Sequence, residues 1–160
     1  MNPDIFRAYD VRGVADRDLT DEVAYALGRA YAAEIRGAGG KRVTLGRDCR
    51  LHGPRLREAF VRGLVESGLQ VIDVGVVPSP LLYFSVFHHD ADGGVQITGS
   101  HNPSDYNGFK MMQGKGSLHG EVIQRLRARI EGADFLSGEG SVSEDLIFDD
   151  YVSYVTGNIA

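Results

Sequence analysis

The sequence predicts a three-layer α/β/α domain with a mixed, mostly parallel sheet, and three observations lead to that prediction. Segments with helical periodicity alternate with short apolar segments that are typical of strands. Glycine or proline marks most of the boundaries between them. Polar residues suited to chemistry follow several strand segments, at the edge where an α/β sheet gathers its ligands. The 160 residues suffice for one such domain and show no internal repeat.

Two helices and two strands are predicted in the first half of the chain. Thr20 can cap a helix whose apolar residues recur three and four positions apart, and the glycine-rich segment 37–40 ends it. Pro54, at a first-turn position, opens a second helix that ends at Gly68. A strand is predicted after each helix, at 42–45 and at 71–74.

The next part of the chain predicts two further helices and two further strands. Residues 81–87 are apolar on nearly all sides, which indicates a short buried helix. Strands are predicted at 95–98 and 109–112. Only about ten residues separate them, too few for a helical crossover, so we expect an antiparallel return. A helix follows at about 120–130.

The two ends of the chain have weaker patterns. The segment 6–13 is interpreted as a loop before the first helix. Residues 132–143 contain mainly small and acidic residues and are predicted to be a linker. Ser143 is then predicted to cap a last amphipathic helix, whose apolar side carries Phe148, Tyr151, Val152 and Val155.

Composition excludes several classes of partner. The net charge is −5, from 22 acidic and 17 basic side chains, and nucleic acids or anionic membranes bind basic surfaces. Cys49 is the only cysteine, which rules out an intrachain disulfide and favours a reducing compartment. The start of the chain is polar, and no run approaches the roughly 20 apolar residues of a membrane span. We therefore expect a cytoplasmic protein that binds neither nucleic acid nor membrane.

The most informative loop is Thr98-Gly99-Ser100-His101-Asn102-Pro103, one of three predicted at the carboxyl edge of the sheet together with 46–50 and 75–80. It places a hydroxyl nucleophile, Ser100, after a flexible glycine, with Lys110 within local reach. The nucleophile elbow of serine hydrolases needs glycines two residues on either side of the serine, but Ser100 has Thr98 and Asn102 there. The segment 108–116 has the wrong spacing of glycines and lysine for a P-loop. The loop therefore favours phosphoryl transfer.

A phosphate on Ser100 would bring about −1.5 to −2 charges and would need positive neighbours. Lys110, Arg12, Arg7 and Arg47 are the candidates. Two plainer interpretations stay open, namely that Ser100 is a turn residue and that 6–13 is a solvated loop held by Arg–Asp pairs. A hydrolase that uses Ser100 with His101 is a weaker alternative, because adjacent residues on one loop rarely adopt nucleophile–base geometry.

Five ordered motifs carry a resemblance to a known family. The chain closely resembles the first domain of the α-D-phosphohexomutases, most of all the bacterial phosphomannomutase/phosphoglucomutase branch. The resemblance spans nearly the whole chain. Its motifs are Phe6-Arg7-Ala8-Tyr9-Asp10-Val11-Arg12-Gly13, Gly46-Arg47-Asp48, Val77-Pro78-Ser79-Pro80, the Ser100 loop and Asn107-Gly108-Phe109-Lys110.

The resemblance implies a mechanism and its residues. Ser100 would carry a covalent phosphate and exchange it with a hexose 1- or 6-phosphate, such as glucose or mannose phosphate, through a hexose 1,6-bisphosphate. Lys110 would act as general acid/base, with His101 beside the nucleophile. Tyr9 and Arg12 would line the substrate site. Phosphoryl transfer depends mostly on positioning and charge neutralisation, which suits such a set.

The chain departs from the family pattern in length. Family enzymes have four domains, and the second supplies an Asp-rich loop for Mg²⁺ that is not found in this sequence. Of the Mg²⁺ ligands, only the phosphate oxygen on Ser100 would come from this chain, and Mg²⁺ would bind weakly or not at all. We expect a catalytic domain at 1–132, then a linker and terminal helix at 133–160 leading toward an absent second domain.

Two functions from different classes follow. In the first, the chain is the N-terminal catalytic domain of a phosphohexomutase, inactive by itself, whose partners are hexose phosphates and the remaining domains of the enzyme. In the second, it is a free-standing phosphosugar-binding or regulatory domain without turnover.

Overall fold

A mixed seven-stranded sheet forms the centre of the computed structural model, which describes residues 1–159. Its strand order is β1-β5-β4-β2-β3-β7, and β6 pairs with β5. The strands are β1 (Val11–Val14), β2 (Arg42–Arg47), β3 (Gln70–Val76), β4 (Gly93–Ile97), β5 (Tyr106–Gln113), β6 (Gly116–Ser117) and β7 (Ser141–Glu144).

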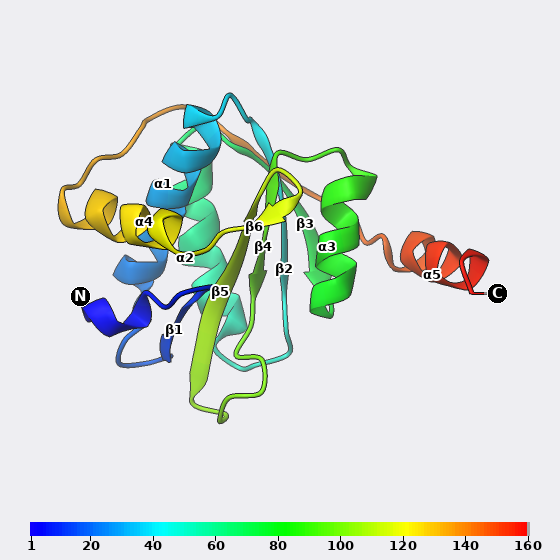
Figure 1. Ribbon diagram of the computed structural model, residues 1–160, viewed down its shortest axis with the longest axis horizontal. Coiled ribbons are helices and arrows are strands. Elements are labelled where there is room, and N and C mark those ends of the chain that lie inside the picture. Colours follow the sequence, from blue (N-terminus) through cyan, green and yellow to red (C-terminus); the bar gives the residue numbers. More distant parts are fainter. Residues whose placement is uncertain (160) are drawn as a thin grey trace.

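Helices lie on both faces of this sheet (Figure 1). A short 3₁₀ turn at Pro3–Ile5 precedes them, and the helices are α1 (Asp21–Gly37), α2 (Gly53–Glu66), α3 (Ser79–His88), α4 (Glu121–Glu131) and α5 (Phe148–Gly157). Helices α1, α2 and α4 cover one face, α3 covers the other, and α5 lies beyond α3. The predicted α/β/α layers and the mixed sheet are confirmed.

Strand direction decides where the site can form. Strands β2, β3, β4 and β7 run parallel, whereas β5 is antiparallel to β4 and to β1. The expected antiparallel return from β4 to β5 is therefore confirmed. Since Arg47 pairs with both Val76 and Ile97, the carboxyl ends of β2, β3 and β4 meet at one edge of the sheet.

The face under α1, α2 and α4 holds the larger core. Phe60 lies fully buried between two aromatic rings, with its centroid 4.9 Å from that of Phe109 and 6.2 Å from that of Tyr31. Helices α1 and α2 approach so closely that a Cβ at Gly28 would lie 2.3 Å from the Phe60 carbonyl oxygen. A Cβ at Gly63 would lie 2.4 Å from the Tyr25 carbonyl oxygen, so both helices need glycine at their contact.

Two expectations about the ends of the chain are wrong. The predicted loop 6–13 contains the start of β1, which pairs with β5, and the predicted linker 132–143 contains most of β7, which pairs with β3. Both are four-residue edge strands, and every residue of β7 is exposed. Strand β7 has no buried face to produce an apolar alternation, and β1, although Val11 is buried, is too short for its alternation to stand out, so pairing at the sheet edge rather than local sequence selects both strands.

The start of the last helix also differs from the prediction. Ser143 does not cap it, because Ser143 lies within β7, opposite Ile72 of β3. The helix α5 begins at Phe148, after Ile147, whose side chain is buried. Within residues 1–159, no helix has the length and apolar character needed to cross a membrane.

Candidate active site

The loop that joins β4 to β5 presents Ser100 at the carboxyl edge of the sheet. Ser100 is exposed and has a φ of +52°, the left-handed region that a residue with a side chain seldom adopts. Its N–H donates to Thr98 Oγ1 at 2.8 Å, and its Oγ lies 3.3 Å from His101 Nδ1. The predicted pair of Ser100 and His101 is thus within hydrogen-bond reach in this structure.

The loop after β2 packs against the Ser100 loop and fixes its first residues. Asp48 Oδ2 accepts a hydrogen bond from Thr98 Oγ1 at 2.8 Å and another from the Gly99 N–H at 3.0 Å. Arg47, a predicted phosphate partner, instead donates to the carbonyl oxygen of Asp48 at 3.2 Å. The two loops therefore act as one unit at the ends of neighbouring parallel strands.

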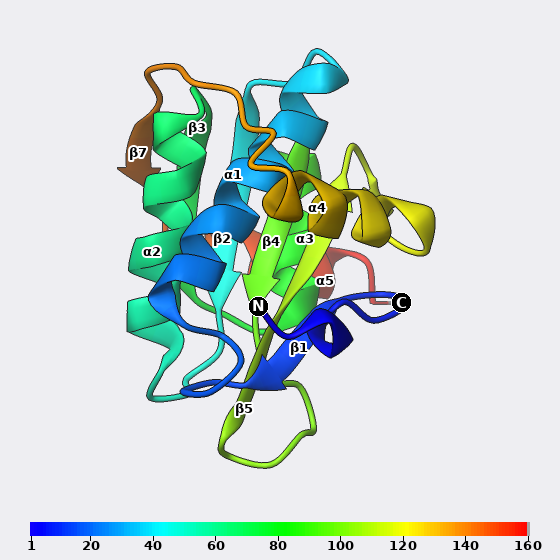
Figure 2. The same ribbon diagram turned by 90° about the vertical axis from the view of Figure 1, so that its left-hand side faces the viewer.

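A cluster of cations lies beside this loop, where β1 and β5 run side by side (Figure 2). Arg12 pairs with Gly108 in the antiparallel register, so Arg12 and Lys110 project from the same face of the sheet. They line a cavity of about 590 Å³ together with Arg7 and Tyr9. The structure thus brings three residues of the N-terminal segment together with Lys110, which lies about a hundred residues later in the sequence.

Asp10 links the two inner cations of this cavity. Its side chain is 7% exposed, accepts a hydrogen bond from Arg12 Nη2 and lies 3.6 Å from Lys110 Nζ. The interpretation of an Arg–Asp pair in this segment is therefore correct, and the pair also serves the cavity. Asp10 is a functional residue that was not predicted individually, although its position two residues before Arg12 indicates such a pair.

Ser100 and the cations line two adjoining cavities rather than one. Ser100 borders a second cavity of about 770 Å³, which also contains Asp48, Arg50 and His52. Asn102 lines both cavities, so the Ser100 loop forms the wall between them. The structure brings Tyr9, Arg12 and Lys110 together and places Ser100 with His101 on the loop next to them.

Asp18 holds the far end of β1 and thereby the strand that carries Arg12. Its carboxylate accepts hydrogen bonds from the Arg17 side chain and from the Val14 N–H, at 2.9 and 3.0 Å respectively. The Arg17 guanidinium in particular holds the pKa of Asp18 well below its usual range, although partial burial opposes this. The ionised carboxylate is therefore part of the folded state at neutral pH.

The residues present do not form a metal site by themselves. Across residues 1–159, no group of three or more His, Cys, Asp or Glu side chains is arranged to hold an ion. The Asp10 carboxylate is already shared by two cations, and Asp48 is occupied by the Ser100 loop. A Mg²⁺ ion would need most of its ligands from outside these residues.

One protein family matches most of the chain. The family described as phosphoglucomutase/phosphomannomutase, alpha/beta/alpha domain I, matches residues 3–137. The match includes β1, both cavities and the Ser100 loop, and it ends before β7.

Curated relatives and a solved structure extend the similarity to nearly every residue. The chain is 49% identical over 158 residues to the phosphoglucomutase of Neisseria meningitidis serogroup B, covering 98% of this chain and 34% of that protein. It is 48% identical over 156 residues to the phosphomannomutase/phosphoglucomutase of Pseudomonas aeruginosa, with the same two coverages. A crystal structure of a Burkholderia thailandensis phosphoglucomutase/phosphomannomutase family protein superposes with a TM-score of 0.95 at 41% identity, over 99% of this chain and 36% of that one. The chain thus spans about a third of the length of the curated relatives it matches.

Proposed function

The chain belongs to the phosphoglucomutase/phosphomannomutase family, and from this premise we propose that it is the phosphoserine-bearing domain of an enzyme that interconverts hexose 1- and 6-phosphates. It corresponds to the N-terminal domain of these relatives. One observation carries the proposal: a serine held at the carboxyl edge of the sheet adjoins a cavity lined by Arg7, Arg12 and Lys110.

In the proposed step, the phosphoryl group on Ser100 moves to a free hydroxyl of a hexose monophosphate. The bond between phosphorus and Ser100 Oγ breaks, a bond to the sugar oxygen forms, and the hydroxyl proton passes to the Lys110 amine. The leaving Ser100 Oγ takes up a proton from solvent, so the products are a hexose 1,6-bisphosphate, a free serine and a protonated Lys110. Transfer of the other phosphoryl group back to Ser100, after the sugar turns round, completes the isomerisation. Apart from the covalent role of Ser100, such transfers depend mainly on positioning and charge neutralisation.

The roles of the neighbouring residues follow from their chemistry. Arg12 has a planar guanidinium that can bind two phosphate oxygens at once, and Asp10 limits its orientations. Tyr9 is 73% exposed at the rim of the cavity and would contact the sugar. His101 would hydrogen-bond the nucleophile oxygen, as its 3.3 Å approach to Ser100 Oγ suggests.

Other domains of the enzyme would supply the remaining parts of the active site. Because the chain spans about a third of its relatives, the sugar-reading residues and the Mg²⁺ ligands would come from the remaining domains. Mg²⁺ would neutralise charge on the transferring phosphate there. A cytoplasmic location fits the hexose phosphate substrates. The domain boundary at residue 132 stays a prediction. Strand β7, after that boundary, pairs with β3 and so extends the same sheet. The comparisons give no support to a free-standing binding module.

A chimera tests the proposal. Residues 1–160 would replace the matching third of the Pseudomonas aeruginosa relative, and conversion of glucose 1-phosphate to glucose 6-phosphate would be measured. We expect turnover in the chimera and none in residues 1–160 alone. Ser100→Ala should lower turnover by about a thousandfold or more, because the phosphoryl carrier is lost. It should also abolish the mass increase of one phosphate after incubation with glucose 1,6-bisphosphate.

Ser104→Ala is the matched control, because Ser104 is an exposed serine on the same loop. It should leave both turnover and phosphorylation unchanged. A folded chimera that neither turns over nor takes up phosphate, or one in which Ser100→Ala has no effect, would contradict the proposal.

A further inference from the structure

The side chain of Arg50 lies inside the Ser100 loop. Its Nη2 donates to the carbonyl oxygens of Ser100 and Asn102, at 3.2 and 2.6 Å. Its Nη1 donates to the carbonyl oxygens of Pro103 and Tyr106, the latter at 2.9 Å. Four carbonyl groups, three in the loop and one at the start of β5, thus converge on the guanidinium of Arg50, whose side chain is only 16% exposed.

The guanidinium has no free donor left after these contacts. Arginine carries five N–H groups, and the fifth, on Nε, faces Asp48 Oδ2 at 3.4 Å. A lysine could not replace it, because an ammonium group has three donors and no planar fork. Without a cation here, four carbonyl dipoles would point at one another across a small space, which is unfavourable.

Gly99 adapts the loop to this side chain. A Cβ at Gly99 would lie 2.3 Å from both Cζ and Nε of Arg50. The guanidinium cannot move aside without giving up its carbonyl partners, so the clash would displace the loop. The glycine before the nucleophile is therefore explained by close contact with Arg50.

Both peptide groups of the nucleophile are fixed by the same two loops. The carbonyl oxygen of Ser100 accepts from Arg50, and its N–H donates to Thr98 Oγ1, which itself donates to Asp48. The Asp48 carboxylate also accepts from the backbone N–H of Arg50 at 3.1 Å. The left-handed conformation of Ser100 is unfavourable for a residue with a side chain, and these hydrogen bonds hold it.

We propose that Arg50 is a positioning residue that holds Ser100 in its left-handed conformation, with the hydroxyl oriented for phosphoryl transfer. This inference rests on the proposed function of Ser100. It assigns Arg50 no contact with the substrate, because its donors all face the protein. Its loss should therefore affect the chemical step more than substrate binding. A misplacement of about 1 Å at a reacting atom can lower the rate by about a hundredfold.

The test uses Arg50→Lys in the chimera, with Arg57→Lys as the matched control. Arg57 also binds a carboxylate, that of Asp73, with its Nε at 2.7 Å, but it does not contact the Ser100 loop. We expect Arg50→Lys to lower kcat by about a hundredfold while KM changes by less than about threefold. Arg57→Lys should leave kcat unchanged. In Arg50→Ala, added guanidinium chloride at low millimolar concentration should restore part of kcat.

A kcat for Arg50→Lys within about twofold of the native chimera would overturn the inference, as would a loss confined to KM. A second readout uses residues 1–160 alone and needs no turnover. Amide exchange at Ser100 should become at least about tenfold faster in Arg50→Lys, with no change at Val95 in the buried strand β4. Unchanged exchange at Ser100 would also overturn it. If the native chimera lacks turnover, the proposed function fails, while the exchange result still decides whether Arg50 positions the loop.

Discussion

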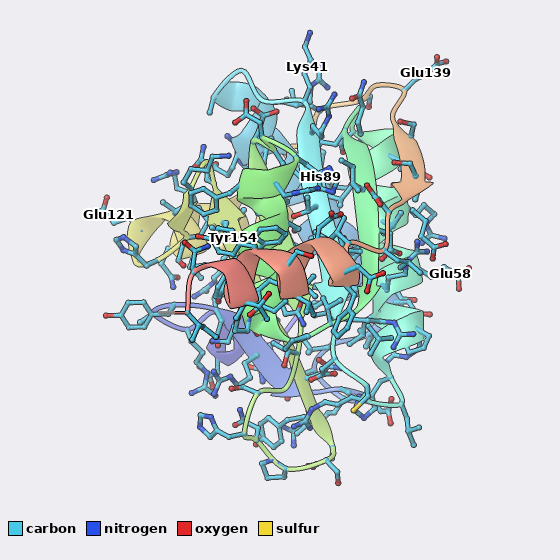
Figure 3. All side chains as sticks on the ribbon, turned by 90° about the vertical axis from the view of Figure 1, so that its right-hand side faces the viewer. Lys41, Glu58, His89, Glu121, Glu139 and Tyr154 are labelled. Atoms are coloured by element: carbon cyan, nitrogen blue, oxygen red, sulfur yellow. The ribbon has the colours of Figure 1, made fainter. Side chains whose placement is uncertain are left out.

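The two faces of the sheet differ in the size and continuity of their hydrophobic cores. Beneath α1, α2 and α4 lies one continuous core, in which Phe60 is fully buried and the glycine contact brings two helices together. The opposite face has two small apolar clusters under α3, and α5 has no buried residue. In Figure 3, α5 crosses in front of α3, and Tyr154 is labelled there; its ring centroid lies 5.1 Å from that of Phe84.

The large-core face supports the strands that lead to the site. Strands β2 and β4, which lead into the loops of Asp48 and Ser100, are anchored mainly from the large-core face, because Leu45, Val95 and Ile97 belong to that core. The α3 face contributes polar ties instead, such as Gln96 Nε2 to the Val77 carbonyl oxygen at 2.7 Å. The site should therefore depend on the first face for its stability and be less sensitive to changes on the second.

Truncating one aromatic residue on each face gives the largest contrast. Phe60→Ala should lower the free energy of unfolding by about 3–5 kcal/mol, because it leaves a large cavity between Tyr31 and Phe109. Phe84→Ala, on the α3 face, should cost about 1–2 kcal/mol, since Phe84 is only partly buried. Urea unfolding followed by circular dichroism measures both. Equal losses would contradict the comparison.

The glycine contact offers a second test of the large-core face. Gly28→Ala should lower the free energy of unfolding by about 1–3 kcal/mol, because the new Cβ would overlap the backbone of α2. Without a clash, alanine would stabilise a helix by about 1 kcal/mol relative to glycine. The sign of the change in the free energy of unfolding therefore shows whether the clash dominates. Gly37→Ala is the control, since Gly37 is in the same helix and has open space around it. A stabilising Gly28→Ala would show that the helices can separate at no cost.

Glu34 ties α4 to α1 and makes this face sensitive to acid. Its carboxylate, 7% exposed, accepts from Arg129 Nε at 2.9 Å and from Arg125 Nη2 at 3.1 Å. Burial alone would raise the pKa of Glu34, but the two arginines outweigh it and lower that pKa below its ordinary value. A lowered pKa means that the stabilisation is complete above the unfolded-state pKa and is lost as pH falls through the folded-state value.

We therefore expect the free energy of unfolding to fall below about pH 4.5, with Glu34 contributing about 1–2 kcal/mol of that loss. Glu34→Gln should be less stable at pH 7 and show a flatter decline on acidification. Glu131→Gln is the control, because Glu131 forms an exposed pair with Arg127 on the same helix. Urea midpoints between pH 3 and pH 7 provide the measurement, and parallel curves for Glu34→Gln and the native chain would refute the assignment.

The smallest effect is expected on α5. Phe148 is 60% exposed, so Phe148→Ala should change the free energy of unfolding by about 0.5 kcal/mol or less in residues 1–160. The same urea unfolding experiment measures it. A loss above about 1 kcal/mol would mean that α5 packs on α3 as firmly as α2 packs on α1, and the contrast between the faces would disappear.

Much of the fold and part of the site could be predicted from the sequence. The helix capped by Thr20 and the antiparallel return to β5 were predictable, because caps, periodicity and loop length are local properties. The approach of Arg12 to Lys110 was not, because it depends on the pairing of β1 with β5, and β1 has no pattern of its own. Arg50 was missed for a related reason, because its carbonyl partners lie about 50 residues away, and the contact of Asp10 with Lys110 was missed because it too depends on the β1–β5 pairing.

The sequence by itself determined the alternation of helices and strands, the family motifs and the identity of Ser100 as the candidate phosphoryl carrier. Each of these features depends on residues that lie close together in the sequence. The pairing of β1 and β7 with the sheet, the contact of Gly28 with α2 and the position of Arg50 inside the Ser100 loop depend instead on the folded chain. These features arise where segments some 30 to 100 residues apart meet, and register and close packing, rather than local preference, set such contacts.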